Sequence, residues 1–167
     1  GIREEIREFF GGELVNEGET AGIILIAGKN TDGNQDSVDL ESLKSEGFEI
    51  CVPEEKKVVI RSNSNNGLLY GLYTMVKDCI CVGTIKEQRS IPQSSLRFIN
   101  HWDNFDGSIE RGYAGGSIFY QNNQFVDDVD MIRDYARFMA SVGINAISIN
   151  NVNVKKKEMH FLEQPQL

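Results

Sequence analysis

The sequence predicts an α/β protein in which a small α+β domain, a mixed sheet with helices, is followed by one β–loop–α–β unit. In the first half, short apolar runs alternate with helical stretches, and two of those runs are β-prone neighbours. In the second half, a helix lies between two strand-like runs, and such units form parallel sheets. Residues 83–95 are polar and contain a proline, so we place the boundary there, with domains over residues 1–93 and 94–167.

The first domain is expected to open with a helix and a buried strand. Apolar residues recur at helical spacing over residues 2–10, and Gly11 ends the pattern. Residues 22–27 (GIILIA) form a short apolar run that suits a buried strand. Residues 29–36, rich in Asn, Asp and Gly, predict a loop, and the leucines of residues 40–43 fit a short helix.

A hairpin and a long helix complete the first domain. Residues 48–52 and 57–62 are β-prone, and residues 53–56 between them predict a four-residue connection. Residues 63–66 are polar and suit a helix cap, and the helix that follows is expected to continue to about Ile80. Its apolar face is wide, which predicts that it packs against the sheet.

The second domain is expected to contain two strands joined through a loop and a helix. We place a strand over residues 96–100, a loop to about residue 124, a helix over 131–142 and a strand over 144–149. Asp127 or Asp128 suits the cap of the helix, and Gly143 suits the C′ position after it.

Composition excludes several classes of function. The chain has 167 residues and a formal charge of −8, so we expect no nucleic-acid-binding surface. No apolar run approaches the roughly 20 residues that a membrane span needs. Cys51, Cys79 and Cys81 form neither a disulfide framework nor a metal motif, so we expect small buried thiols and no metal or cofactor. Such cysteine usage favours a reducing, cytoplasmic compartment, although the localisation cannot be read from the N-terminal residues.

A polar loop directly after a strand is the candidate binding site. Residues 100–116 read NHWDNFDGSIERGYAGG, and two asparagines follow the second strand. The carboxyl ends of parallel strands are where ligands bind in α/β sheets. Tryptophan can stack on a sugar ring, amides bond hydroxyls and arginine pairs with carboxylates, so we predict a pocket for a polar small molecule. The candidate binding residues are His101, Trp102, Asp103, Asn104, Glu110, Arg111, Asn150 and Asn151.

Each aromatic or amide candidate also has a structural interpretation. Trp102 is either a sugar platform, which its place after a strand favours, or a core residue. His101 either polarises a sugar hydroxyl or satisfies the loop backbone. Asn150 and Asn151 either bind the ligand or form a turn at the strand end.

Each charged candidate likewise has a structural interpretation beside the functional one. Asp103, Asp106 and Glu110 are expected to hold the shape of the loop rather than to catalyse, and Glu110 is the best candidate for substrate contact. Arg111 either binds a sugar carboxylate or clamps Asp103 or Asp106, and the nearness of both acids favours the clamp. Tyr113 is expected to pack within the loop.

Three segments closely resemble glycoside hydrolase family 67, the α-glucuronidases. They are residues 58–78 (VVIRSNSNNGLLYGLYTMVKD), 100–119 (NHWDNFDGSIERGYAGGSIF) and 135–154 (YARFMASVGINAISINNVNV). The resemblance implies an α+β accessory domain followed by the first unit of a (β/α)₈ TIM barrel, here truncated. It also implies hydrolysis, with inversion and without a metal, of the α-1,2 bond of 4-O-methylglucuronic acid on xylo-oligosaccharides.

Inversion needs a general acid and a general base about 6.5–9.5 Å apart, with a water between them. In the family these carboxylates lie on later barrel strands. We therefore expect no catalytic residue in this chain and no activity from it alone.

Two other interpretations stay open from the sequence. The chain can be a non-catalytic scaffold or interaction domain, or it can belong to another two-domain glycosidase, such as a β-hexosaminidase relative. The residues from His101 to Gly115 argue against the latter. Unpaired barrel strands tend to associate, so we expect them to pack back on the first domain or to form a homo-oligomer.

Overall fold

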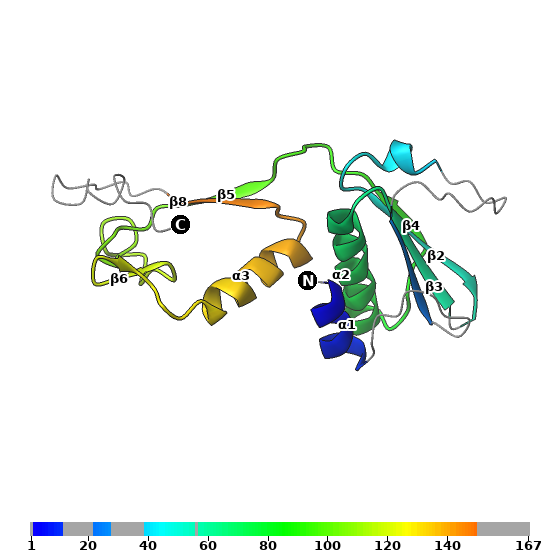
Figure 1. The fold of residues 1–167 in the computed structure, drawn as a ribbon, viewed down its shortest axis with the longest axis horizontal. Coiled ribbons are helices and arrows are strands. Elements are labelled where there is room, and N and C mark those ends of the chain that lie inside the picture. The colour runs from blue at the N-terminus through cyan, green and yellow to red at the C-terminus, as the bar shows by residue number, and fades with distance from the viewer. Residues whose placement is uncertain (1, 12–21, 28–38, 56, 150–167) are drawn as a thin grey trace. The chain divides into compact units, whose positions relative to one another are not determined.

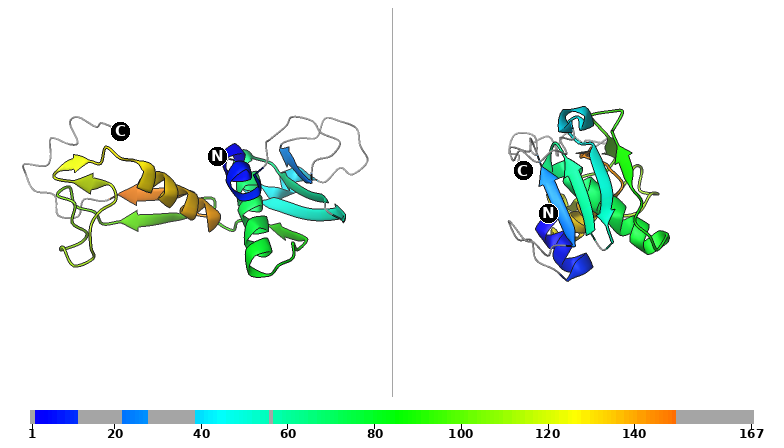
Figure 2. Two further views of the ribbon diagram at one scale, coloured as in Figure 1. Left: turned by 90° about the horizontal axis from the view of Figure 1, so that it is seen from below. Right: turned by 90° about the vertical axis from the view of Figure 1, so that its right-hand side faces the viewer.

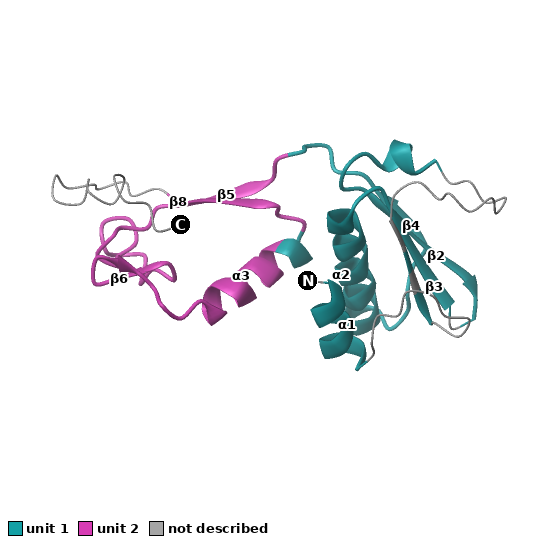
Figure 3. Cartoon of the chain, viewed as in Figure 1, with its two compact units in different colours: residues 1–95, 140–142 teal, residues 96–139, 143–167 magenta. Residues whose placement is uncertain are grey.

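The computed structural model describes residues 2–11, 22–27, 39–55 and 57–149. Two compact units divide the chain, as Figure 3 shows. Unit 1 consists of Gly1–Ser95 with Ala140–Val142, and unit 2 of Leu96–Met139 with Gly143–Leu167. The predicted loop at residues 29–36 lies outside the described residues.

Unit 1 is built on a mixed four-stranded sheet with the order β1-β3-β2-β4 (Figure 1). Its elements are α1 (Ile2–Phe10), β1 (Ile23–Ala27), the 3₁₀ helix η1 (Leu40–Leu43), β2 (Phe48–Glu54), β3 (Lys57–Ser62), α2 (Asn65–Cys81) and β4 (Gln88–Ser90). β1 runs parallel to β3, whereas β2 pairs antiparallel with both β3 and β4. The helices α1 and α2 cover one face of this sheet, as the views in Figures 1 and 2 agree.

The predicted helices, strand and hairpin of unit 1 are confirmed, but the hairpin connection is shorter than predicted. β2 continues through Pro53 to Glu54, and its pairing with β3 shifts register between Cys51 and Glu54. Such an irregularity accommodates a proline, which has no N–H to donate to the ladder. The periodicity of side chains could not show this, because the pairing at this point depends on the backbone.

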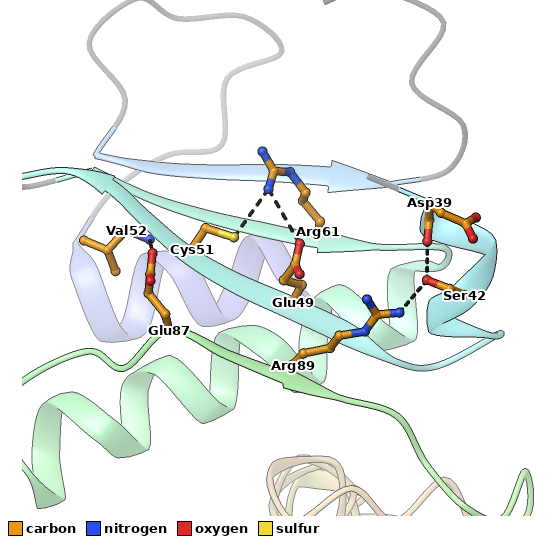
Figure 4. A network of polar contacts seen from close by, with 8 residues as sticks. All are labelled: Asp39, Ser42, Glu49, Cys51, Val52, Arg61, Glu87 and Arg89. Atoms are coloured by element: carbon orange, nitrogen blue, oxygen red, sulfur yellow. Dashed lines mark hydrogen bonds and ion pairs between the residues drawn. The ribbon is translucent and has the colours of Figure 1, made fainter. Parts of the chain in front are cut away.

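Strand β4 was not predicted, since residues 83–95 were interpreted as a polar boundary. Its three residues carry no apolar signal, and its backbone pairs with β2 from Phe48 to Ile50. Side chains join β4 and its flank to the rest of unit 1 (Figure 4). The Glu87 carboxylate accepts a hydrogen bond of 2.9 Å from Val52 N–H, and the Arg89 guanidinium donates to the Ser42 hydroxyl.

The core of unit 1 lies between the sheet and α2. Ile50, Ile60, Leu72 and Met75 are at most 1% exposed. Helix α2 begins where the polar cap was predicted, because the Ser64 hydroxyl accepts a hydrogen bond of 3.1 Å from Gly67 N–H.

The cysteines are not the buried residues that the sequence predicts. Cys79 and Cys81 are exposed at the end of α2, together with Ile80, so the apolar face of the helix ends earlier than predicted. Cys51 is half-buried on β2, and the Arg61 guanidinium donates to its sulfur over 3.4 Å (Figure 4). Burial, and then the charge of Glu49, raises the pKa of the Cys51 thiol above its ordinary value, which disfavours the thiolate form.

Unit 2 contains the predicted β–loop–α–β unit. β5 (Phe98–His101) and β8 (Ala146–Ile149) are parallel neighbours, and α3 (Asp130–Ser141) lies between them in the chain. Gly143 has a φ of 79°, and Ile144 N–H donates to Met139 O over 2.9 Å. This is the glycine-terminated helix end that the sequence predicts.

The segment predicted as one long loop contains a further hairpin, β6 (Tyr120–Gln121) with β7 (Gln124–Phe125). Asn122 and Asn123 join its strands with positive φ values of 53° and 61°. Two left-handed residues are the signature of a tight hairpin turn, and asparagine tolerates that conformation. The Asn-Asn pair in the sequence was therefore a usable signal that the prediction missed.

The core of unit 2 is formed by this loop rather than by the helix. Phe105, Phe119 and Tyr120 are at most 5% exposed, and Ile132 and Tyr135 of α3 pack against them. On α3 itself only Met139 is buried. The apolar side chains of these 12 residues are therefore mostly not buried.

Candidate functional site

The residues after β5 fold into a compact antiparallel structure. Isolated bridges pair Asp103 with Ile109 and Ser108 with Gly116. Asn104 N–H donates to Ser108 O over 2.7 Å, and Glu110 N–H donates to Trp102 O over 2.9 Å. Because Asp103 pairs with Ile109, Trp102 lies directly across from Glu110.

The two faces of this small ladder differ sharply in exposure. Successive side chains in paired segments point to opposite faces. Asp103 is 1% exposed, whereas the preceding Trp102 is 43% exposed. The Trp102 side chain thus lies on the outer face, and the backbone of Glu110 lies across from it.

Asp103, His101 and Tyr135 form a polar chain on the inner face. The Asp103 Oδ2 atom lies 3.5 Å from His101 Nδ1, and His101 Nε2 lies 2.7 Å from the Tyr135 hydroxyl. Phe119 and Tyr135 both meet the imidazole edge-on. The Asp103 charge favours a proton on the nearby Nδ1, which leaves Nε2 to accept the hydrogen bond from Tyr135. Both nitrogens of His101 thus face protein groups.

Asp103 is also an incompletely satisfied buried group. Within the described residues, its Oδ2 atom has no hydrogen-bond partner. Its charge acts on two tyrosines: burial first, and then this carboxylate, raises the pKa of both Tyr120 and Tyr135 above the ordinary value.

Asn104 and Asp106 hold the loop in shape. The Asn104 amide donates to the Ser108 hydroxyl over 2.9 Å and to the Glu110 carbonyl over 2.6 Å. The Asp106 carboxylate accepts from Ser108 N–H at 3.0 Å and from its hydroxyl at 2.6 Å. These contacts match the loop-shaping role expected of Asp106.

Arg111 does not form the predicted clamp. Over residues 57–149 no ion pair joins it to Asp103 or Asp106, and its side chain is exposed. The reason is that Asp103 turns inward toward His101 and Asp106 is engaged by Ser108. Arg111 is thus left at the surface, beside Glu110.

Tyr113 is not packed within the loop, in contrast to the prediction, but is 74% exposed. Gly112 and Gly115, with φ values of 91° and 97°, turn the chain on either side of it. Glu110 adopts the left-handed conformation with a φ of 57°, which is uncommon for a residue other than glycine. The glycine spacing signalled a turn here, but not which side chains it exposes.

The structure therefore groups six of the eight candidate residues at one strand end and divides them by role. Trp102, Glu110 and Arg111 lie at the surface or partly exposed, whereas His101, Asp103 and Asn104 are engaged with the protein. Asn150 and Asn151 lie outside the described residues. Sequence reasoning missed Tyr135 and Phe119 as partners of His101, and no local pattern could have revealed contacts across 34 and 18 positions.

Two other kinds of feature are absent from the part of the chain that the structure describes. No three His, Cys, Asp or Glu side chains there gather as metal ligands would. No helix among the same residues is long and apolar enough to cross a membrane.

Comparison with solved structures shows a fold shared with a larger enzyme. The chain superposes on a GH138 enzyme targeting pectin rhamnogalacturonan II, with a TM-score of 0.53 and 15% sequence identity. The match covers 96% of this chain and 20% of that one. At this identity the likeness concerns the fold alone.

Sequence comparison gives closer relatives, all of them much longer. Probable α-glucuronidase A of Aspergillus fumigatus is 41% identical over 113 residues, which are 66% of this chain and 13% of that protein. α-Glucuronidase A of Aspergillus tubingensis is 39% identical over 124 residues, 70% of this chain and 14% of that protein. The model of the glycosyl hydrolase family 67 middle domain matches residues 81–167, which is more than half of the chain. These residues include the whole candidate site, and the chain belongs to glycosyl hydrolase family 67.

Proposed function

We propose that this chain supplies part of the sugar-binding site of an α-glucuronidase acting on glucuronic-acid-substituted xylo-oligosaccharides. The single observation that carries the proposal is the placement of Trp102, 43% exposed at the end of a parallel strand and directly across from Glu110. An exposed indole surface suits the apolar face of a pyranose ring, and polar groups of the same loop can bond its hydroxyls. Membership of family 67 and relatives named α-glucuronidase support the choice of sugar.

The proposal gives different roles to the residues of the site. Trp102 stacks on a sugar ring, Glu110 bonds its hydroxyls, and Arg111, free of the clamp, pairs with the uronate carboxylate. His101, Asp103 and Asn104 hold the loop that presents them, through the contacts to Tyr135, Ser108 and Glu110 described above. Asn150 and Asn151 are proposed to contribute from the end of the neighbouring strand.

The accompanying proposal for the fold is that residues 94–167 begin a (β/α)₈ barrel and residues 1–93 form the accessory domain. The parallel pair β5–β8, with α3 connecting the strands, is the repeating unit of such a barrel. The bond cleaved is proposed to be the α-1,2 linkage of 4-O-methylglucuronic acid, with inversion.

Intrinsic fluorescence tests sugar binding directly, because Trp102 is the single tryptophan of the chain. Aldotriouronic acid, a methylglucuronic acid on xylobiose, is expected to change the emission in a saturable manner. Cellobiose at the same concentrations serves as the control and is expected to leave the emission unchanged. An emission that does not respond to aldotriouronic acid up to millimolar concentration would reject the proposed site.

We also propose that the general acid and base lie outside these 167 residues. The chain spans 13–14% of the length of the curated relatives it matches. Of the candidate carboxylates, Asp103 is buried against His101 and Asp106 is engaged by Ser108. Incubation of the purified chain with aldotriouronic acid is expected to release no methylglucuronic acid, and measurable release would overturn this part of the proposal.

A further inference from the structure

The segment after β5 buries a carboxylate and exposes an indole, which is the reverse of what the hydrophobic effect favours. Asp103 is 1% exposed, whereas Trp102, the residue before it, is 43% exposed. Aspartate is rarely buried unless it is well paired, and an indole gains much from burial. Because adjacent residues of a paired segment point to opposite faces, exchanging the two faces would bury the indole and expose the carboxylate. A further contact must therefore hold the observed orientation.

The carboxylate of Asp103 is held only weakly by its own contacts. Among the residues that the structure describes, its Oδ2 atom has no hydrogen-bond partner. This atom lies 3.5 Å from His101 Nδ1, beyond the usual range for a hydrogen bond. A buried oxygen without a partner costs free energy in the folded chain. The inward position of Asp103 therefore depends on where the imidazole of His101 is held.

Tyr135 of α3 holds that imidazole. The Tyr135 hydroxyl lies 2.7 Å from His101 Nε2, and the rings of Tyr135 and Phe119 meet the imidazole edge-on, with centroids 5.3 and 5.2 Å from it. Burial, and then the charge of Asp103, raises the pKa of Tyr135 above its ordinary value, so the hydroxyl keeps the proton that it donates to Nε2. A donor at Nε2 leaves the proton of the neutral ring on Nδ1, the atom that faces the Asp103 carboxylate.

We propose that Tyr135 is a positioning residue whose hydroxyl, acting through His101 and Asp103, keeps the Trp102 indole on the outer face, where it can meet a sugar. This inference rests on the proposed function for the identity of the ligand, whereas the orientation of Trp102 can be measured without a ligand. The sugar-facing surface of the loop thus depends on a helix residue 34 positions along the chain from His101. Without the hydroxyl, Nδ1 no longer has to carry the proton, the carboxylate loses its one polar neighbour among the residues described, and the two faces can exchange.

Tyr135→Phe tests the proposal, because it keeps the ring that packs on His101 and removes only the hydroxyl. Trp102 is the single tryptophan of the 167-residue chain, so the intrinsic fluorescence of tryptophan reports on this side chain alone. In the variant without ligand, we expect the emission to shift to shorter wavelength and quenching by acrylamide to fall. The affinity for aldotriouronic acid is expected to fall about three- to tenfold, the range that the loss of one neutral hydrogen bond allows.

The matched control is Tyr73→Phe, which removes a hydroxyl from a 7% exposed tyrosine of α2 in unit 1. This control is expected to leave the emission, the quenching and the sugar affinity unchanged. A second measurement needs no variant: ¹⁵N NMR of the His101 ring at about pH 9, where an ordinary imidazole is neutral, should show the proton on Nδ1. A proton on Nε2 would overturn the role of Tyr135, because its hydroxyl could then not donate to that atom.

The inference and the proposed function fail separately. If Tyr135→Phe leaves the emission and the quenching of Trp102 unchanged, whatever happens to its stability, the hydroxyl does not orient the indole and the inference is overturned. If the wild-type chain does not bind aldotriouronic acid, the proposed function fails, and the quenching of the free chain still decides whether Tyr135 orients Trp102. The ring-nitrogen measurement on the wild-type chain decides the role of Tyr135 even if the variant does not fold.

Discussion

Asp103 carries a carboxylate into the interior of unit 2, where it is 1% exposed. An isolated buried charge is costly, and only the imidazole of His101 lies close enough to offset part of that cost among the residues described. The same carboxylate raises the pKa of two neighbouring tyrosines, so its charge can be followed from the groups around it.

Removing the charge of Asp103 is expected to lower the pKa of Tyr120 and of Tyr135. In Asp103→Asn, the pKa of Tyr120 and of Tyr135 should fall toward the ordinary value of 10.0, because a phenolate is no longer opposed by a nearby anion. Both should stay above it, since burial is the larger cause of each shift. A pH titration of the ¹³Cζ tyrosine resonances measures this.

The conservative control is Asp103→Glu, which keeps the negative charge and should keep both tyrosines near their wild-type titration. Tyr113, whose shift involves Glu110 and not Asp103, is an internal reference in every variant. Unchanged titration of Tyr120 and Tyr135 in Asp103→Asn would show that the carboxylate is not charged in the folded chain.

At the scale of elements, α2 and the sheet approach each other closely at two glycines. A Cβ added to Gly67 would lie 2.6 Å from the carbonyl oxygen of Gly47, and one added to Gly71 would lie 2.6 Å from a methyl group of Ile60. The added Cβ at Gly67 would also meet the Ser62 side chain, and its contact with the Gly47 carbonyl is with backbone, which cannot rotate away as a side chain can. It also adjoins the 2.6 Å hydrogen bond from the Ser62 hydroxyl to Gly47 O.

Gly67→Ala is therefore expected to lower the free energy of unfolding by about 1–3 kcal/mol, despite the better helix propensity of alanine. Lys77→Ala, at an exposed position of the same helix, is the control and should stay within about 0.5 kcal/mol of the wild type. Urea unfolding followed by circular dichroism measures both. Equal stability of Gly67→Ala and the wild type would mean that α2 does not lie as close to the sheet as described.

The elements that the sequence predicted are those with a clear apolar period or cap. The pairing of β5 with β8 and the glycine after α3 are of this kind. β4, the extension of β2 and the β6–β7 hairpin were missed because backbone pairing of short polar segments leaves little trace in side-chain periodicity. The burial of Asp103 against His101 and Tyr135 was missed because it depends on tertiary contact.

At the scale of the whole molecule, unit 2 exposes apolar side chains that a stable surface would usually cover. Leu96, Phe98, Met131 and Phe138 are each more than half exposed. Met131 and Phe138 are seven residues apart on α3 and therefore lie on one stripe of the helix. Such surfaces promote association.

The chain is accordingly expected to self-associate at high concentration, which is one of the two outcomes that the sequence analysis left open for its barrel strands. Sedimentation velocity should show an average mass that rises between about 10 and 300 µM, whereas the double variant Met131→Glu, Phe138→Glu should shift the rise to higher concentration. The matched control is Arg133→Glu with Arg137→Glu, which alters the charge of α3 but leaves the apolar stripe intact. A wild-type chain that stays monomeric over this range would contradict the expectation.

The central claim is that the outer face of the loop after β5 binds the sugar. Amide and indole NMR of the ¹⁵N-labelled chain, titrated with aldotriouronic acid, tests it most directly, because each backbone amide then reports on its own contacts. We predict that the largest shifts occur at the Trp102 indole, at Glu110 and at Asn150, with residues 39–95 unaffected. Shifts confined to residues 39–95, or none at saturating ligand, would contradict the assignment of this surface.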